Sequence, residues 1–408
     1  MKKIILHAFL LFLFIQTTVA QLTIEKLLSA PFYSTISVAP NGINVAWLKN
    51  ERGVRNIQIA NTATGVVTDL TNFTDDDGQE ITNFEWLPDA SALYFVRGNS
   101  PQVRATLNHN PAHLLDGTTP TIWKMNIASR KLQKIGIGGS ISISSKGDHL
   151  AFLRNGQVFL KNLSDTLSPK QLFFAKGGCS SLHWSPDGKN LAFVSSRSDH
   201  SFVGVYDFVK KDYTYFEPAV DNDGSPSWSP DGKSLAFLHI QRETELVAFS
   251  MPHRETSPWS IKVADISTGK TRTVFTADAG SGSVYNPHNG HDQLMWSANA
   301  DKIFFCWEKT GWQQLYDVSA SGNNKAVQIT EGAFEVDEVN ATKDNTALIF
   351  NSNQNDIDRK HLWRINTGDS KPIPEQITKG NSIEALFQIS PDGKKFFSFT
   401  QTNAHRHK

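Results

Sequence analysis

A short turn sequence recurs along the chain, and this repeat restricts the fold more than any other feature. The clearest copies begin at Ser185, Ser229 and Ser390, and each reads Ser-Pro-Asp-Gly-Lys. Weaker copies have their second residue at Pro40, Pro88, Ser145, Ala298 and Lys343. The third positions of successive copies are 41 to 68 residues apart. This spacing is typical of four short strands with their turns.

The turn has a clear physical role. Proline presets φ, aspartate bonds to the local backbone, and glycine accepts a positive φ. Apolar residues flank each turn, which predicts a buried strand pair. A third strand and an outer strand follow, for example at residues 261–265 and 272–275. We therefore predict an all-β fold, a β-propeller of WD40-like or TolB-like blades with seven blades and an incomplete eighth. A β-sandwich is the alternative, but it does not predict eight copies of one turn.

Two modules are longer than the others, and the last one is short. We expect loop insertions at about residues 102–119 and 239–258, and inserted loops on regular scaffolds often carry function. The eighth module shows one hairpin and is truncated after about residue 400. Residues 22–36 are a candidate for the strand that closes the ring.

The first twenty residues predict a secretory signal peptide. Lys2 and Lys3 precede an apolar run at residues 4–15, and Ala20 marks the cleavage site. Twelve apolar residues are too few to cross a bilayer core of about 30 Å. We expect residues 21–408 to form one propeller domain, exported to the periplasm or the extracellular space, without a membrane span.

The charge balance and the cysteine content bear on which functional classes and which disulfides are expected. The chain has 40 basic and 40 acidic residues, so it lacks the basic excess of a nucleic-acid-binding protein. Its two cysteines, Cys179 and Cys306, fall in modules four and six, so we expect two buried free thiols rather than a disulfide.

The sequence contains no catalytic or cofactor motif that we can identify. G-x-S-x-G, H-E-x-x-H and P-loop sequences are absent. His288, His291 and Asp292 lie close together, but no further ligand spacing supports a metal site, so we interpret them as a polar loop. The blade tryptophans are expected to pack between blades. We therefore predict no catalytic residue, metal or cofactor in this chain.

Four strings carry a more specific resemblance. They are SPWSIKVAD at 257–265, FCWEKTGW at 305–312 with Leu315-Tyr316, FEVDEV at 334–339, and NSNQNDIDRKHLWR at 351–364. Together they resemble the N-terminal propeller of dipeptidyl peptidase IV-type enzymes in the prolyl oligopeptidase family. The resemblance covers about residues 30–400. In that family an α/β-hydrolase domain with the catalytic triad follows the propeller, and this chain stops where that domain would begin.

The resemblance implies a non-catalytic propeller that gates substrates and binds peptides for a serine exopeptidase. The chain would be a truncated or split gene product, with the hydrolase domain lost or separate. In such enzymes acidic propeller residues bind the free α-amino group of a peptide. Glu308, together with Arg254 and Glu255 of the insertion, is the predicted site for a peptide or protein N-terminus. A stand-alone TolB-like scaffold that binds protein or glycan is the alternative.

Overall fold

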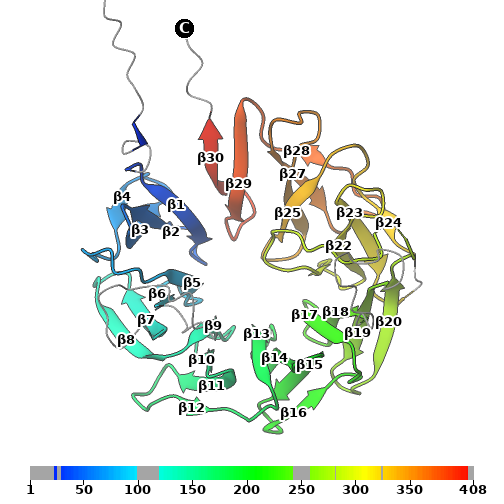
Figure 1. The fold of residues 1–408 in the computed structure, drawn as a ribbon, viewed down its shortest axis with the longest axis horizontal. Coiled ribbons are helices and arrows are strands. Elements are labelled where there is room, and N and C mark those ends of the chain that lie inside the picture. The colour runs from blue at the N-terminus through cyan, green and yellow to red at the C-terminus, as the bar shows by residue number, and fades with distance from the viewer. Residues whose placement is uncertain are drawn as a thin grey trace, which may run out of the picture.

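The computed structural model describes residues 23–24, 29–98, 119–241, 258–280, 282–322 and 325–402. The described residues form thirty strands, which follow one another in chain order as mainly antiparallel sheets arranged in a ring (Figure 1). A single parallel bridge between Ser201 and Asn222 joins two neighbouring sheets. The all-β propeller prediction is confirmed. The described part of the chain contains no helix long and apolar enough to cross a membrane. The predicted signal peptide lies outside the described residues.

Each blade is a set of four strands, apart from the last. Blade 1 holds β1 (Phe32–Val38), β2 (Asn44–Glu51), β3 (Val54–Asn61) and β4 (Val67–Asp69). Blade 2 holds β5 (Ile81–Trp86), β6 (Ala92–Arg97), β7 (Thr121–Asn126) and β8 (Leu132–Ile137). Blade 3 holds β9 (Gly139–Ile143), β10 (His149–Arg154), β11 (Gln157–Asn162) and β12 (Lys170–Gln171). Blade 4 holds β13 (Gly178–Trp184), β14 (Asn190–Ser196), β15 (Ser201–Asp207) and β16 (Asp212–Tyr215).

The second half repeats this order. Blade 5 holds β17 (Asn222–Trp228), β18 (Ser234–Ile240), β19 (Ser260–Asp265) and β20 (Thr271–Thr276). Blade 6 holds β21 (Met295–Trp296), β22 (Lys302–Trp307), β23 (Gln314–Ser319) and β24 (Val327–Gln328). Blade 7 holds β25 (Val336–Ala341), β26 (Ala347–Ser352), β27 (His361–Asn366) and β28 (Glu375–Gln376). Blade 8 holds only β29 (Ser382–Ile389) and β30 (Phe396–Thr402) among the described residues.

The recurrent turn joins the first and second strands of each blade. In blade 5 the Ser229 hydroxyl donates to Asp231 Oδ1 at 2.7 Å and accepts the backbone N–H of Ser234 at 2.9 Å. The N–H of Gly232 donates to the Ser229 carbonyl at 2.8 Å. The turn chemistry inferred from the repeat is therefore present, and each turn satisfies its own backbone groups.

The tryptophan before the turn links neighbouring blades. The indole N–H of Trp184 donates to the Ser142 carbonyl at 3.1 Å, and that of Trp228 donates to the His183 carbonyl at 3.0 Å. Trp86 and Trp296 make the corresponding bonds to Ser37 Oγ and to the Ser227 carbonyl. The packing role expected for these four side chains is thus observed, and the bond holds the preceding inner strand at the channel wall.

The turns also contact one another around the ring. A Cβ on Gly232 would lie 3.5 Å from Pro186 Cδ of the preceding turn. The same contact crosses the junction between the ends of the ring, where a Cβ on Gly42 would lie 3.6 Å from Pro391 Cδ. Gly42 has φ of 69°, so glycine is favoured there by conformation as well as by position. The ring therefore closes by packing of turns and inner strands.

The proposed closing strand was wrong. Residues 32–36 belong to β1, which pairs with β2 as the inner strand of blade 1 and adds no strand to β30. Blade 8 instead meets blade 1 through side chains, and the rings of Tyr33 and Phe399 stack at 6.4 Å. In Figure 1 the pair β29 and β30 lies between blade 7 and blade 1.

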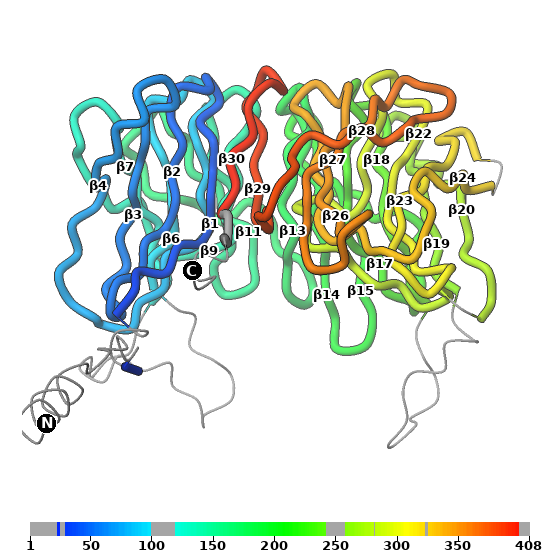
Figure 2. The backbone as a smooth tube through the Cα atoms, turned by 90° about the horizontal axis from the view of Figure 1, so that it is seen from above, coloured from blue at the N-terminus to red at the C-terminus, as the bar shows by residue number. Residues whose placement is uncertain are grey.

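Two strand ends position the predicted peptide site. The second strand of every complete blade runs toward the same face of the ring, where it turns into the third strand. β18 of blade 5 and β22 of blade 6 both end on this face, at the lower edge of the tube in Figure 2. The insertions expected at 102–119 and 239–258 fall almost wholly outside the described residues.

Cys179 and Cys306 are both buried and free, as predicted.

Candidate functional site in the central channel

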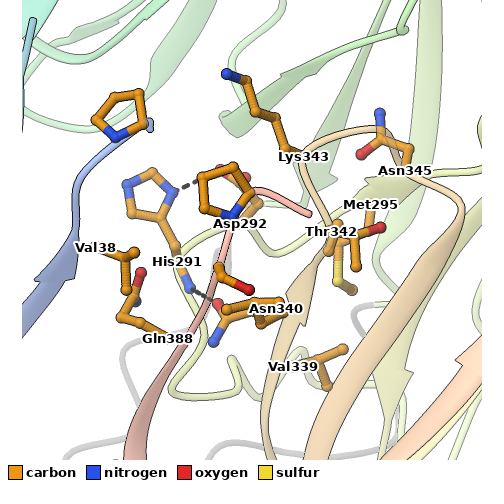
Figure 3. Close-up of a pocket in the computed structure, with 15 residues that line it drawn as sticks. Val38, His291, Asp292, Met295, Val339, Asn340, Thr342, Lys343, Asn345 and Gln388 are labelled. Carbon is orange, nitrogen blue, oxygen red and sulfur yellow. Dashed lines mark hydrogen bonds and ion pairs between the residues drawn. The ribbon is translucent and has the colours of Figure 1, made fainter. Parts of the chain in front are cut away.

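A polar channel with ionisable side chains in its wall runs through the ring. One stretch has a volume of about 530 Å³ and is lined by the inner strands of blades 2 to 7. A second stretch of about 460 Å³ adds residues of blades 1 and 8. Both are lined by His291, Asp292 and Met295, so they form one passage (Figure 3).

Most of the channel wall comes from one position of the repeat. In blades 2 to 8 the residue three places before the second turn position lines the passage. These residues are Glu85, Ser142, His183, Ser227, Met295, Asn340 and Gln388. Because side chains alternate along a strand, this residue faces the channel while the next one packs between blades. Only Glu85 and His183 of this set are ionisable.

The connection between β20 and β21 adds two more ionisable groups to the channel. Asn289 anchors this connection to β25, because its amide Nδ2 donates to Asp337 Oδ1 at 2.6 Å and its N–H donates to the Asp337 carbonyl at 2.8 Å. The His291 N–H points to Asn340 Oδ1 at 3.4 Å. His291 is thereby held in the channel, with 74% of its side chain exposed (Figure 3).

His291 and Asp292 form an ion pair in the passage. Their Nδ1 and Oδ1 atoms are 3.0 Å apart. The hydrogen bond that His291 donates to the Asp292 carboxylate raises the pKa of His291 to about 9, so this imidazole is protonated at neutral pH. Burial alone would raise the pKa of Asp292, but the bond to His291 outweighs it and the pKa is lowered.

Glu85 and His183 face this pair from blades 2 and 4. The His183 and His291 rings lie 6.2 Å apart, edge to face. Burial raises the pKa of Glu85 to about 7, although the charge of His291 opposes the shift. Burial also lowers the pKa of His183. The channel therefore holds a cation, an anion, a neutral imidazole and a carboxyl that titrates near pH 7.

These groups do not form a metal centre or a nucleophilic triad. No cluster of three or more His, Cys, Asp or Glu side chains suited to a metal ion occurs among the described residues. His288, the third member of the polar loop, is buried and accepts the Gly290 N–H on Nδ1 at 2.9 Å. Burial lowers its pKa to about 4, so it is neutral. The polar and charged side chains that line the channel can bind polar or charged ligands by hydrogen bonds and ion pairs.

Glu308 lies outside the channel, on the face where β22 ends. Its carboxylate is half-buried and receives the Asn286 amide at 3.5 Å, and no ion pair involves it in the described part of the chain. The neighbouring Lys309 pairs with Asp278 at 2.6 Å. Arg254 and Glu255 lie outside the described residues, so their position relative to Glu308 stays a prediction.

Gly282 ties the Glu308 region to the core. Its carbonyl accepts the indole N–H groups of Trp307 at 2.7 Å and of Trp259 at 3.1 Å. A Cβ on Gly282 would lie 2.7 Å from Trp307 Nε1 and 2.8 Å from Lys309 Cα, so only glycine fits this approach. The sequence segments SPWSIKVAD and FCWEKTGW therefore lie close together, because a tryptophan of each donates to the same carbonyl.

Comparison with a family model gives a relationship for part of the chain. Residues 241–404 match the dipeptidyl peptidase IV (DPP IV) N-terminal region. Over these residues, which are less than half of the chain, the sequence is similar to that region. The matched DPP IV-type region runs from the end of blade 5's second strand to β30, and it includes Glu308, His291 and Asp292.

Solved structures show a similar fold over most of this chain. Dipeptidyl peptidase 4 of Porphyromonas gingivalis is 13% identical with a TM-score of 0.60, over 88% of this chain and 55% of the other. A prolyl endopeptidase is 10% identical with a TM-score of 0.56, over 90% of this chain and 54% of the other. An oligogalacturonate lyase in complex with manganese is 14% identical with a TM-score of 0.51, over 82% and 88%.

These identities establish a shared fold only. The chain spans about half the length of the two peptidases. No curated protein sequence matches it. Sequence reasoning named Glu308, whose role stays a prediction, and it did not name Glu85 and His183, although counting three residues back from the second position of each turn identifies both. It named His291 and Asp292 without placing them in the channel.

Proposed function

We propose that this chain is the non-catalytic propeller of a DPP IV-type serine exopeptidase, in which it binds peptides and gates their access to a hydrolase domain. The observation that carries the proposal is the family match of residues 241–404, the part that supplies both Glu308 and the His291–Asp292 pair. A channel lined by hydroxyl, amide and ionisable groups suits passage of an extended peptide, whose backbone needs hydrogen-bond partners throughout.

The peptide N-terminus is proposed to bind at Glu308. A protonated amine forms strong charge-assisted hydrogen bonds with a carboxylate that has no cationic partner of its own. Glu308 meets this condition among the described residues, because its one observed partner is the Asn286 amide. β18, which leads into the insertion that contains Arg254 and Glu255, ends on the same face as β22. These three residues remain the proposed site.

The test is a titration of a short proline-containing peptide with a free N-terminus against the full chain. Its N-acetylated form removes the positive charge and is the ligand control. We expect binding to be weakened about tenfold by acetylation and by Glu308→Gln, the scale of one charge-assisted bond. Glu331→Gln is the matched control, since Glu331 is an exposed carboxylate of the next connection. Equal affinity of native protein and Glu308→Gln would reject the site.

A further inference from the structure

His291 presents one ring nitrogen to the channel without a protein partner. Its Nδ1 lies 3.0 Å from Asp292 Oδ1, whereas Nε2 makes no hydrogen bond or ion pair within the described part of the chain. In Figure 3 this second nitrogen points away from Asp292, and 74% of the side chain is exposed. Because both nitrogens of a protonated imidazole carry a hydrogen, Nε2 is a charged donor that a molecule in the passage can reach.

Many of the other side chains in the channel wall are neutral and can donate hydrogen bonds. Seven amides and hydroxyls that line the passage make no side-chain hydrogen bond to the described protein. They are Asn83, Ser140, Ser142, Ser181, Ser227, Asn345 and Gln388. A ligand at His291 that carries acceptor atoms can therefore be bonded from several inner strands, without displacing an existing contact.

The charges in the wall favour an anion. Five ionisable side chains line the described passage, namely Glu85, His183, His291, Asp292 and Lys343. Burial raises the pKa of Glu85 to about 7, so its carboxyl is mostly neutral at pH 6. His291 and Lys343 then carry two positive charges against the single negative charge of Asp292. The resulting excess of one positive charge attracts an anion and disfavours a cation.

Lys343 adds its charge where the recurrent turns surround the channel. The second turn position is uncharged in the other seven copies: Pro40, Pro88, Ser145, Pro186, Pro230, Ala298 and Pro391. Only blade 7 has a cation there. Lys343 is exposed, takes part in no ion pair among the described residues, and lines the same stretch of the passage as His291 (Figure 3). Its ammonium group is therefore available to a ligand rather than to a neighbouring turn.

We propose that the channel contains a subsite for a carboxylate. The Nε2–H of His291 donates to one carboxylate oxygen, and hydroxyl or amide groups of the wall donate to the other. A carboxylate fits this set because it has two acceptor oxygens, no donor, and one negative charge to match the excess in the wall. The inference rests on the proposed function, because a peptide in the channel would supply the carboxylate from its C-terminus or from an acidic side chain.

The test uses ligands that do not probe the proposed amine site at Glu308. N-acetylated Ala-Pro-Ala with a free C-terminus is titrated against the full chain at pH 6, and its C-terminal amide is the control. We expect the acid to bind about tenfold more tightly than the amide. The amide of N-acetylated Ala-Pro-Asp separates the two sources, since it binds like the acid if a side-chain carboxylate is also accepted. Glu308→Gln should leave the preference unchanged.

Substitution of His291 locates the subsite. His291→Gln keeps a hydrogen-bond donor but removes the charge, and we expect it to reduce the preference for the acid to about twofold or less. His200→Gln is the matched control, because His200 also pairs with an adjacent aspartate, at 2.7 Å, but does not line the passage. Lys343→Gln should weaken binding of the acid more at low salt than at high salt.

The pH dependence gives a second readout. The titratable and charged groups that face His291 are Glu85 of β5, His183 of β13, Asp292 and Lys343, while β25 and β29 contribute the neutral Asn340 and Gln388. Binding of the acid should weaken from pH 6 to pH 8 because Glu85 becomes charged, and loss of a proton from His183 acts in the same direction. Glu85→Gln should reduce this dependence.

Three results would overturn the subsite: equal affinity for acid and amide, a preference for the acid that survives His291→Gln, or no binding of any of the three peptides. None of them decides the proposal for Glu308, because every peptide in this experiment lacks a free amine. A protein that binds a free N-terminus through Glu308 but shows no preference for the acid would retain the proposed function and lose the carboxylate subsite.

Discussion

At the residue scale, Glu85 is a carboxyl whose negative charge is disfavoured by its surroundings. It has no hydrogen bond or ion pair of its own among the described residues, and burial raises the pKa of its carboxyl to about 7. A neutral carboxyl is therefore favoured in the folded state up to near pH 7. Such a group is typical of functional clefts, where a carboxyl changes charge in the range in which ligands bind.

Glu85 should make stability fall as pH rises. Its folded pKa lies above the usual value of 4.5, so the folded protein holds a proton that the unfolded chain releases between about pH 4.5 and 7. Because the side chain is only half-buried and faces the channel, we expect a loss of about 1 kcal/mol over this window. Urea unfolding of native protein and of Glu85→Gln at pH 4.5, 6 and 8 measures it. Identical pH profiles would contradict the assignment.

At the scale of elements, the turn and the tryptophan before it form one unit. The hydroxyl at the first turn position satisfies a backbone N–H and orders the aspartate, while the indole reaches the carbonyl of the preceding blade. These contacts explain why Ser-Pro-Asp-Gly is preceded by tryptophan in blades 4 and 5. The weaker copies keep parts of the unit, such as Thr342 Oγ1 donating to Asp344 Oδ1 at 2.8 Å in blade 7.

Removing the turn hydroxyl should destabilise the fold. In Ser229→Ala the fully buried Ser229 loses both bonds and leaves the Ser234 N–H without its acceptor. We expect a loss of about 1–2 kcal/mol in the free energy of unfolding. Ser267→Ala removes a hydroxyl bonded to Asp265 in an exposed turn, and there we expect less than about 0.5 kcal/mol. The prediction fails if chemical denaturation gives equal losses.

Among the described residues β30 pairs with β29 alone, and its other edge should affect how the protein behaves in solution. Phe396-Phe397-Ser398-Phe399 is apolar, uncharged and rich in β-forming residues, and unpaired edges of this kind promote association. We expect concentration-dependent association in sedimentation velocity, and early proteolytic cleavage between residues 388 and 402. Ser398→Lys places a charge on the edge and should reduce association. A monomer at all concentrations, with β30 protected from protease, would argue against an exposed edge.

At the scale of the whole molecule, the described blades form a ring with ionisable groups lining its central passage. Blades 2, 4 and 6 bring Glu85, His183 and the His291–Asp292 pair to a common channel, although these residues are far apart in sequence. These groups are the ones on which the proposed passage of a peptide through the channel depends.

The isolated chain should not hydrolyse dipeptidyl or aminoacyl amides. Acyl transfer by a serine enzyme needs a nucleophile, a base and an oxyanion site in register, and the sequence contains no G-x-S-x-G elbow. We expect a rate equal to the buffer blank with a chromogenic dipeptidyl amide. Turnover that a serine-directed phosphonate blocks would contradict this prediction, whereas turnover that persists would point to a contaminating enzyme of another class.

The sequence by itself determined the blades. Turn residues, apolar alternation and module length are local properties, because a strand's side-chain period and a turn's φ values depend on neighbouring residues. They were sufficient for the propeller, for its strand positions such as β19 and β20, and for two separate free cysteines. They also identified the strings around Trp259 and Trp307.

Only the tertiary structure decided how the ring closes and what lines its channel. β1 pairs with β2 within blade 1. The first and last blades of the ring are joined instead by the packing of Gly42 near Pro391 and by the stacking of Tyr33 on Phe399. His291 enters the channel because Asn289 is bonded to Asp337, 48 residues away. Contacts between distant residues depend on how the blades stack in space, and no local sequence pattern encodes which residues meet. The repeat could therefore be predicted from the sequence, whereas the residues that line the channel could not.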